Sequence, residues 1–474
     1  MAKRFPARAE ARGPDEPARV YAVSLGCAKN LVDSEVMLGR IGEAGFAITT
    51  SPEDADVLLV NTCGFIASAK EESLEAIRSL CAAKRKSGGT KRVVVVGCLA
   101  QRYAEELERE IPDVDAIVGV GEGEEMGTIL RGVLEDGRGR RVRDPTRPIG
   151  ADVGRLRLTP PHYAYVKISE GCDHACTFCA IPAIRGRFRS KPLPAVLDEV
   201  RELVASGARE IVLISQDTTS YGLDAEGGPR LPELLEKVAG VPGVDWVRLL
   251  YAHPALLSDP VVEVIARTEP IVKYIDLPIQ HISSKVLRRM GRGLDGEKTR
   301  RLLDRIRERV PGVYIRTTLL VGFPGEDVSD FEELRRFVAD FQFERLGVFA
   351  YSEEEGTPAA RLPDRVPEEV RAERAEEIML LAQDIAFRQN RRREGERALA
   401  LVDEVSEAGG GILARARSYG EAPEIDPAIL VRLRGPRGQR RRHARGAPQA
   451  GDMVRVRISG SEGYDLLAEL LPAT

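Results

Sequence analysis

The chain has 474 residues, of which 43% are hydrophobic and 30% charged, and its formal net charge is -4. This length predicts about three domains, because single hydrophobic cores stop growing well below it. The longest apolar runs, such as residues 93–96, are far shorter than the roughly 18 residues that span a bilayer, which excludes a membrane-spanning helix and a membrane partner. The small negative charge excludes binding of polyanions through the whole surface, so any nucleic-acid contact is expected to be local.

The first 18 residues, MAKRFPARAEARGPDEPA, lack the apolar core of a secretory signal. Their prolines and mixed charges predict a disordered leader. The whole chain has seven cysteines, an odd number. Together with the missing export signal, that count favours a reducing cytoplasm and metal ligation over a disulfide framework.

Residues 19–143 alternate between strand-like and helical patterns. The predicted strands are residues 20–25, 57–60, 93–96 and 116–120, and the predicted helices are residues 31–44, 67–86 and 100–111. Strands that alternate with helices form parallel sheets, so this region is expected to be an α/β domain with a doubly wound sheet. The Arg-, Gly- and Pro-rich residues 144–160 predict a linker.

Cys27, Cys63 and Cys98 each follow one of these predicted strands. Loops at the carboxyl ends of parallel strands converge on one rim of a sheet, so the three thiols are expected to meet. Three thiolates without a fourth ligand suit an iron–sulfur cluster with one open iron, and the alternative is three independent buried cysteines. Cys81 lies inside a helical stretch and is predicted to be a packing residue.

The central region, residues 161–390, opens with a strand-like run and the array Cys172, Cys176 and Cys179. A structural zinc site takes four protein ligands, usually as two pairs, and no second pair lies nearby. Three thiolates can hold three irons of a cubane cluster and leave the fourth iron free to chelate a small molecule and pass it an electron. The alternatives are a zinc site completed by His174 and a disulfide with a spare thiol.

Six strand-like runs in this region are separated by helical segments. They are residues 164–168, 211–215, 246–251, 274–279, 314–321 and 346–351. Six strands are short of the eight that close a full barrel, which predicts an incomplete parallel (β/α) barrel with its active groups at the carboxyl ends of the strands. The residues at those ends include Ser215, Gln216, Asp217, His253, Gln280, His281, Gly322, Phe349 and Tyr351.

Three groups of polar residues carry two interpretations each. His253 and His281 fit structural hydrogen bonding as well as a place in the site. Arg185 and Arg187 are predicted to lie on a solvated face, the alternative being that they neutralise an acidic substrate. Residues 431–446 hold seven arginines in sixteen positions, so the segment 432–445 is either a phosphate contact or a solvated loop.

The C-terminal part follows a long charged helix predicted for residues 368–395. From residue 391 to residue 474, short alternating stretches separated by Gly and Pro predict a small antiparallel β-barrel. These stretches are residues 398–405, 411–418, 428–435, 452–459 and 465–471.

The cysteine motifs carry a resemblance to a known family. SLGCAKNLVDSE, NTCGFIASAKEES and VVGCLAQRY, together with EGCDHACTFC, resemble the methylthiotransferases, a branch of the radical S-adenosylmethionine (SAM) enzymes. The resemblance covers about 450 residues and implies that the C-terminal barrel is a TRAM domain. Ala28 stands where this branch usually has proline, and we expect little consequence because it supplies no ligand atom.

The resemblance implies SAM and two [4Fe-4S] clusters as cofactors. Cys172, Cys176 and Cys179 would hold the radical SAM cluster, whose open iron binds SAM in this family. The other trio, Cys27, Cys63 and Cys98, would hold an auxiliary cluster. Contacts to SAM are expected from Phe178, Ser215, Gln216, Asp217, Gly322 and Phe349.

Two branches of methylthiotransferases differ in substrate. SQDTTSYG and APEID look like the branch that modifies an aspartate of the twelfth protein of the small ribosomal subunit, whereas the transfer-RNA adenosine branch typically has GCQMN and GQN, which are absent here. The resemblance therefore implies addition of sulfur and a methyl group at the β-carbon of that aspartate, with electron-donor and sulfur-donor proteins as partners. The alternatives are the transfer-RNA activity and a non-enzymatic RNA-binding protein that needs zinc to fold.

Overall fold

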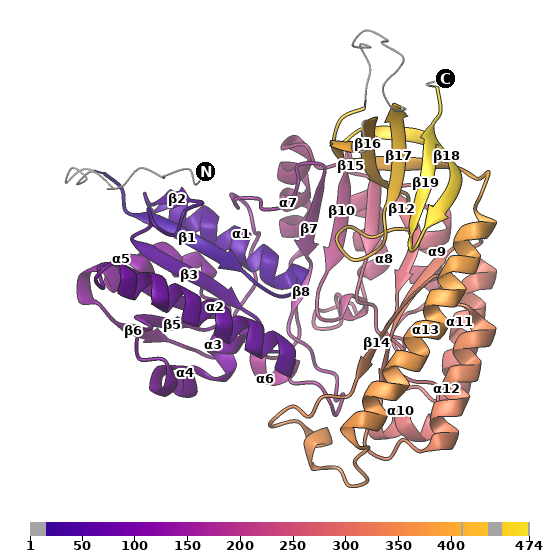
Figure 1. Cartoon of the computed structure of the whole chain (residues 1–474), viewed down its shortest axis with the longest axis horizontal. Coiled ribbons are helices and arrows are strands. Elements are labelled where there is room, and N and C mark those ends of the chain that lie inside the picture. Colours follow the sequence, from indigo (N-terminus) through magenta and orange to yellow (C-terminus); the bar gives the residue numbers. More distant parts are fainter. Residues whose placement is uncertain (1–15, 409–410, 435–447, 473–474) are drawn as a thin grey trace, which may run out of the picture. The chain divides into compact units, whose positions relative to one another are not determined.

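The computed structural model describes residues 16–408, 411–434 and 448–472 (Figure 1). The chain divides into two compact units. Unit 1 comprises Met1–Pro148, Asp152–Leu158 and Ala180–Arg187, and unit 2 comprises Ile149–Ala151, Thr159–Cys179 and Phe188–Thr474. Among the described residues, no helix is both long enough and apolar enough to cross a membrane.

Unit 1 is built on one six-stranded sheet in which neighbouring strands pair in parallel. In spatial order the strands are β2 (Ala47–Thr49), β1 (Arg19–Ser24), β3 (Val57–Thr62), β4 (Arg92–Gly97), β5 (Ala116–Val118) and β6 (Gly139–Arg141). The doubly wound α/β prediction is confirmed. The sequence did not indicate β2 and β6, because each has three residues and β6 reads Gly-Arg-Arg, without an apolar run.

Helices of unit 1 cover both faces of this sheet. They are α1 (Ala28–Glu43), α2 (Ala67–Lys86), α3 (Cys98–Arg102), α4 (Ala104–Glu110), α5 (Met126–Asp136) and α6 (Ile181–Arg185), with a short 3₁₀ turn, η1 (Gly123–Glu125). Val57 and Leu59 of β3 pack in the layer of α1 and α5, whereas Leu58 and Val60 pack in the layer of α2. Burial on both faces explains why this strand is apolar until its last two residues. Cys81 lies in the α2 layer with 1% exposure, which confirms its packing role.

Unit 2 contains a second six-stranded parallel sheet. In spatial order the strands are β14 (Arg345–Ala350), β13 (Tyr314–Val321), β12 (Ile271–Asp276), β11 (Trp246–Leu249), β10 (Glu210–Ile214) and β7 (Tyr163–Lys167). The sheet stays open between β14 and β7, which confirms the incomplete barrel. A two-residue pair of strands, β8 (Ser169–Glu170) and β9 (Arg189–Ser190), brackets the segment that begins with the CxxxCxxC array.

Helices follow the strands of this sheet. They are α7 (Leu193–Ala205), α8 (Leu231–Ala239), α9 (Asp259–Arg267), α10 (Ser284–Met290), α11 (Gly296–Arg309), α12 (Val328–Phe341) and α13 (Glu368–Arg392), with 3₁₀ turns η2 (Thr218–Ser220) and η3 (Pro358–Arg361). The predicted long helix is therefore present as α13, which lies against α12 and β14 (Figure 1). Its buried Ile378 and Ile385 join the hydrophobic core under the sheet.

The C-terminal part of unit 2 is a closed five-stranded barrel, which confirms the predicted small barrel. Its strands are β15 (Arg397–Ala408), β16 (Gly411–Arg417), β17 (Ile429–Arg434), β19 (Asp465–Leu470) and β18 (Met453–Glu462). All pairs are antiparallel except β17 with β19. Residues 435–445 of the predicted RNA contact lie outside the described residues.

The β16–β17 loop, which contains SYGEAPEID, lies against the amino-terminal part of the open sheet. Arg417, Tyr419, Glu421, Glu424 and Asp426 each bond a side chain from that sheet. Their partners are Tyr163, Tyr165, Glu210, Arg248, Tyr274, Arg316 and Arg345, which come from all six strands. The SYGEAPEID loop thus fastens the barrel to the sheet, and this contact is called the seal below.

Candidate functional site: two cysteine trios

Three loops of unit 1 meet at the carboxyl ends of β1, β3 and β4. A Cβ atom on Gly26 would lie 2.8 Å from the Cβ of Cys63 and 3.2 Å from its sulfur, so the Cys27 loop touches the Cys63 loop. A Cβ atom on Gly64 would lie 2.9 Å from the Cα of the residue after Cys98, so the second loop also touches the third. The structure thus brings the three cysteines to one rim, as their position after parallel strands predicts.

Glycines create the turns that present two of these thiols. Gly26 and Gly97, directly before Cys27 and Cys98, have φ values of +89° and +95°, a backbone conformation that residues with a Cβ rarely adopt. The chain then enters a helix at once, so that Cys27 is the N-cap of α1 and Cys98 is the first residue of α3. Free N–H groups at a helix start stabilise a thiolate.

Two buried asparagines hold the loops together. The amide of Asn30 donates to the carbonyl oxygens of Leu25 (2.6 Å) and Thr62 (3.3 Å). The amide of Asn61 donates to the carbonyl of Asn30 (2.9 Å) and to the Oγ of Ser34 (2.8 Å). These residues were not among the predicted site residues. A polar side chain inside an otherwise apolar strand, as in LLVNTC, was the signal that could have found Asn61.

The thiols of this trio differ in how readily they ionise. Protein atoms surround Cys27 even though solvent reaches it, and this desolvation opposes ionisation; the charges of Lys29 and Arg185 and nearby backbone N–H groups outweigh it and lower its pKa. Burial raises the pKa of Cys63 and raises that of Cys98 to about 11. A cluster would therefore have to replace two thiol protons in a poorly solvated site.

Arg185 was predicted to be solvated, and the structure places it otherwise. The residue is 2% exposed. Its guanidinium donates to Oδ2 of Asp33 (2.7 Å), to Oδ1 of Asn30 (3.3 Å) and to the sulfur of Cys98 (3.2 Å). Sequence reasoning failed here because the partners lie up to 155 positions earlier in the chain. Arg187 is exposed, as predicted.

The second trio lies in unit 2, after β7 and β8. Cys172 is buried, while Cys176 and Cys179 are partly exposed. Desolvation, followed by the neighbouring thiols and Asp217, raises the pKa of Cys172 to about 12 although a backbone N–H opposes it. The loop is fixed by hydrogen bonds from Thr177, whose N–H and hydroxyl donate to carbonyls at the end of α10 at 3.0 and 2.8 Å.

Arg292 is a further residue that the sequence did not single out. It follows α10 and is 7% exposed. One nitrogen of its guanidinium donates to the sulfur of Cys176 (3.3 Å), and another donates to the carbonyl of Pro278 (2.6 Å). The same kind of contact, an arginine donating to one sulfur, thus occurs at each trio.

Asp217 fixes the histidine of the cysteine loop. Its Oδ2 lies 2.6 Å from Nε2 of His174, and its Oδ1 accepts from the N–H of Thr219 at 2.9 Å. The ring of His174 stacks on that of His253, with centroids 3.8 Å apart. His253 is buried, and its Nε2 has no hydrogen-bond partner among the described residues. Burial, with Arg292 and His174 adding to it, lowers the pKa of His253 to about 3, so it is neutral.

Ser215 and Gln216 complete the turn after β10. The Oγ of Ser215 accepts from the N–H of Asp217 at 2.8 Å, so this buried side chain serves the turn itself. The amide of Gln216 donates to Glu170 at 2.7 Å, while its carbonyl oxygen has no partner in the described parts of the chain. Gln216 therefore has one buried acceptor without a partner among the described residues.

The remaining predicted positions lie in different settings. Phe178 packs edge-on against Phe323, with ring centroids 6.4 Å apart. Gly322 faces the side chain of Arg371, because a Cβ atom there would lie 2.1 Å from its Cγ. Phe349, near the end of β14, is 54% exposed.

His281 follows β12 and is completely buried. Its Nδ1 accepts from the N–H of Ser283 at 3.0 Å, and its Nε2 lies 3.6 Å from a carboxylate oxygen of Glu326. Desolvation lowers its pKa to about 3 even though Asp330 opposes the shift. This residue is held in the core as a neutral ring.

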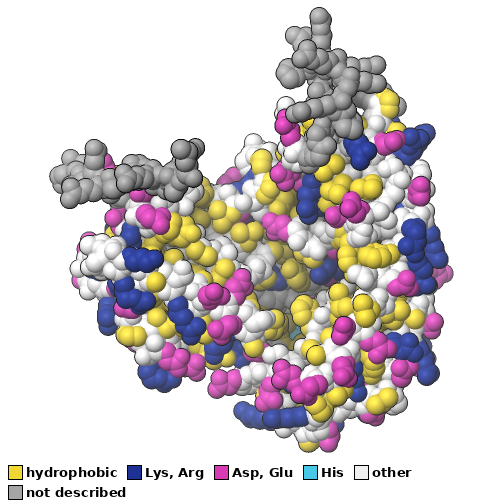
Figure 2. Space-filling view, viewed as in Figure 1, with side chains coloured by type: hydrophobic (Ala, Val, Ile, Leu, Met, Phe, Trp, Pro, Cys, Tyr) yellow, Lys and Arg dark blue, Asp and Glu magenta, His cyan; other side chains and the backbone are white. Residues whose placement is uncertain are grey.

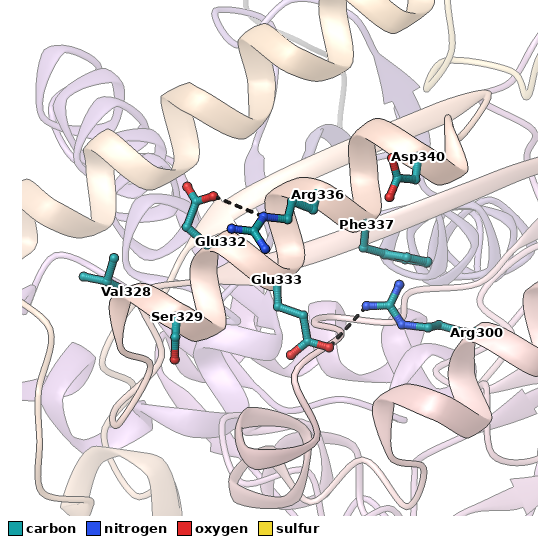
Figure 3. A pocket seen from close by; sticks show the side chains of 8 residues that line it. All are labelled: Arg300, Val328, Ser329, Glu332, Glu333, Arg336, Phe337 and Asp340. Atoms are coloured by element: carbon teal, nitrogen blue, oxygen red, sulfur yellow. Dashed lines mark hydrogen bonds and ion pairs between the residues drawn. The ribbon is translucent and has the colours of Figure 1, made fainter.

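No three His, Cys, Asp or Glu side chains of the described residues converge closely enough to hold a single metal ion. A cubane cluster spreads its thiolates over separate irons, so it needs a wider spacing than one ion does. A surface hollow of about 540 Å³ lies elsewhere, along α11 and α12, where Glu333 pairs with Arg300 and Glu332 with Arg336 (Figure 3). Both of its arginines are paired in this way, and none of the predicted site residues lines it.

The surface is mixed in charge. On the face that Figure 2 shows, basic and acidic side chains of the described residues are interspersed, in keeping with the small net charge. This pattern fits a protein whose contact with nucleic acid, if it has one, is local.

Three family profiles match the chain: Uncharacterized protein family UPF0004 over residues 19–119, the Radical SAM superfamily over residues 166–338 and a TRAM domain over residues 395–471. Among solved structures, the radical S-adenosylmethionine methyltransferase TsrM from Kitasatospora setae shares the fold, with a TM-score of 0.53 and 15% identity over 84% of this chain and 79% of that one. Fold and cysteine array therefore define a radical SAM enzyme with a C-terminal TRAM domain, a class that uses SAM and a [4Fe-4S] cluster.

Curated relatives identify the family within this class. Ribosomal protein uS12 methylthiotransferase RimO of Geobacter sulfurreducens is 44% identical over 96% of this chain and 98% of its own length. RimO of Symbiobacterium thermophilum is 45% identical over 96% of this chain and 91% of its own length. The chain belongs to the RimO family, which confirms the resemblance that the cysteine motifs carry.

Proposed function

We propose that this chain is a methylthiotransferase of ribosomal protein uS12 that attaches a methylthio group to the β-carbon of an aspartate, giving 3-methylthioaspartate. The single observation that carries the proposal is the 44% identity to a curated RimO over almost the whole of both chains. The β-carbon bears hydrogens that no side-chain base can remove to admit sulfur there, so the reaction needs a cofactor that abstracts a hydrogen atom.

The donor sets fit two [4Fe-4S] clusters. Cys172, Cys176 and Cys179 would hold the radical SAM cluster, and Cys27, Cys63 and Cys98 an auxiliary one. These groups, together with SAM, supply the radical, the sulfur and the methyl group. Two features of the chain support the fit: each trio lies at the carboxyl ends of a parallel sheet, and each has an arginine that donates to one sulfur. The seventh cysteine, Cys81, is engaged in the core.

The predicted SAM contacts divide into two roles in this proposal. Gln216 would bind SAM directly, because its carbonyl oxygen has no partner among the described residues and can accept from an amino or hydroxyl group. Ser215 and Asp217 would act through the turn that aims Gln216 and through His174. Phe178, Gly322 and Phe349 remain proposed walls of the site, and of these Phe178 is the one packed against the core.

Partner proteins follow from the chemistry. The reaction takes up electrons and one sulfur atom in each turnover, so it requires an electron donor and a sulfur donor. Its substrate uS12 is either free or within the small ribosomal subunit. The basic segment 432–445 is a candidate for local RNA contact, and Arg432 at its start is exposed on β17. We therefore propose that the protein works in the cytoplasm.

Mass spectrometry tests the proposal. The reconstituted chain is incubated anaerobically with SAM, dithionite, sulfide and either uS12 or transfer RNA, and both substrates are analysed. A gain of about 46 daltons on an aspartate of uS12, the mass of SCH3 replacing hydrogen, is expected. The same gain on an adenosine of transfer RNA, with uS12 unchanged, would assign the chain to the other substrate class.

A further inference from the structure

The contacts of Arg185 set it apart from an ordinary buried ion pair. It lies six positions after Cys179 in the chain, yet its guanidinium is packed in unit 1, 3.2 Å from the sulfur of Cys98. This hydrogen bond ties one cation directly to a sulfur of the trio.

Arg292 makes the corresponding contact in unit 2. Its guanidinium is bonded to the sulfur of Cys176 and held in place by the carbonyl of Pro278. Each guanidinium is thus bonded to one sulfur of the trio in its own unit.

We infer that Arg185 and Arg292 are positioning residues that set the reduction potentials of the auxiliary and radical SAM clusters separately, each through a hydrogen bond to one ligand sulfur. The inference about Arg185 rests on the proposed auxiliary cluster.

The physical reason is charge. Uptake of one electron, from dithionite in the test below, adds negative charge to the cluster and its thiolates, and no covalent bond forms or breaks. A cation that donates a hydrogen bond to a thiolate stabilises this reduced state more than the oxidised one, so it raises the potential. Removing the charge of Arg185 should therefore make the cluster harder to reduce.

Asp33 supplies a test of opposite sign. Its carboxylate lies 2.7 Å from the guanidinium of Arg185 and offsets part of that charge, and it is 22% exposed at the side chain. Replacing Asp33 by Asn removes a negative charge and leaves Arg185 in place. The potential should then rise, by less than Arg185→Gln lowers it, because Asp33 acts from farther away and is partly solvated.

The experiment uses the full-length chain with Cys172, Cys176 and Cys179 changed to Ala, which leaves the auxiliary trio alone. After anaerobic reconstitution, iron is counted and the potential is measured by redox titration with electron paramagnetic resonance. Arg185→Gln should lower the equilibrium constant for one-electron reduction roughly tenfold, about 59 mV for a one-electron couple. Arg185→Lys should lower this equilibrium constant less, because the positive charge remains while the planar guanidinium with its several N–H donors is lost. Asp33→Asn should raise the constant.

The matched control is the chain with Cys27, Cys63 and Cys98 changed to Ala, which keeps only the radical SAM trio. There Arg292→Gln should lower the potential, and Arg185→Gln should leave it unchanged. If the Arg185→Gln variant does not retain its cluster, the other two variants still test the inference. Arg185→Lys should lower the reduction potential and Asp33→Asn should raise it.

Two results would overturn the inference in distinguishable ways. If the background with Cys27, Cys63 and Cys98 intact binds about four irons, but the Arg185 and Asp33 variants change the constant by less than about twofold or in the same direction, the inference fails and the auxiliary cluster stands. If that background binds no iron, the auxiliary cluster and the inference about Arg185 fail together, while the inference about Arg292 fails if Arg292→Gln leaves the potential of the radical SAM trio unchanged.

Discussion

Glu210 pairs with two arginines in the contact between the C-terminal barrel and the open sheet. Its carboxylate is completely buried and lies 2.7 Å from the guanidinium of Arg248 and 2.6 Å from that of Arg417. Arg248 comes from the neighbouring strand, whereas Arg417 comes from the barrel. The desolvation penalty is outweighed by these two cations, so the pKa of Glu210 is lowered.

Glu210→Gln removes the charge and keeps the volume, so no cavity contributes to its cost. Loss of one member of a buried charge cluster costs about 3–5 kcal/mol, because the other members stay buried without compensation. Arg417 keeps two bonds to Asp403 at 2.8 Å, and Arg248 keeps its bond to the carbonyl of Tyr419. We therefore expect the lower end of the range, about 3 kcal/mol.

Trp246 makes this measurable. It is the one tryptophan of the chain, it is 7% exposed, and it pairs in register with Glu210. Urea unfolding of the metal-free chain, followed by Trp246 fluorescence, gives the free energy of unfolding of this sheet. The stabilisation should be present above the ordinary carboxyl pKa of about 4.5 and be lost as the pH falls through the lowered pKa, so wild type and variant should converge in acid.

The exposed pair formed by Asp198 and Arg201 provides the control. Both side chains are 61% exposed, so Asp198→Asn should cost less than about 1 kcal/mol. If Glu210→Gln costs no more than this control, the buried network does not fasten the barrel to the sheet.

Three further predictions concern other parts of the chain. Cys176→Ala should abolish SAM cleavage, measured as 5'-deoxyadenosine, whereas Cys63→Ala should keep this cleavage but lose the gain of mass on uS12. Equal behaviour of these two variants would refute the division of roles between the trios. The control variant Cys81→Ala should change neither measurement. His281 is neutral and buried, with its pKa lowered to about 3. The free energy of unfolding should therefore fall by about 1.4 kcal/mol per pH unit as the pH drops below the ordinary pKa of histidine. His281→Asn should remove this pH dependence in urea titrations. Gly420→Ala would place a Cβ 2.6 Å from the ring of Tyr314 and should cost about 1–3 kcal/mol by the same Trp246 assay, whereas an unchanged stability would mean that the seal is loosely packed.

The sequence predicted the secondary structure best where apolar residues run without interruption. All six strands of the open sheet and all five strands of the barrel were predicted, because each contains a stretch long enough to show its period. The predicted helix 100–111 is in fact two helices, since the chain breaks at Tyr103 with φ -130° and ψ 33°. Nothing in the composition of that segment signals the break.

Side-chain roles were harder to predict than strands. The three thiols after β1, β3 and β4 were expected to meet because parallel topology alone brings those loops together. The prediction for Arg185 was wrong because its burial depends on partners from distant parts of the chain. A charged residue whose partner cannot be recognised in the sequence is predicted to be exposed to solvent. The contact of Asp217 with SAM stays a prediction; in the structure its carboxylate is bonded to His174, Thr219 and Ser220.

The two ends of the open sheet therefore differ in how their polar side chains are engaged. At the carboxyl ends lie Cys172, Gln216 and His253, and among the described residues the Gln216 carbonyl oxygen and the His253 Nε2 have no hydrogen-bond partner. At the amino ends every strand contributes a side chain to the contact with the SYGEAPEID loop, and the buried charges there are paired. In parallel barrels the residues at the amino ends of the strands serve stability, whereas those at the carboxyl ends serve catalysis. In this chain the acidic residues of SYGEAPEID therefore fix the barrel to the sheet.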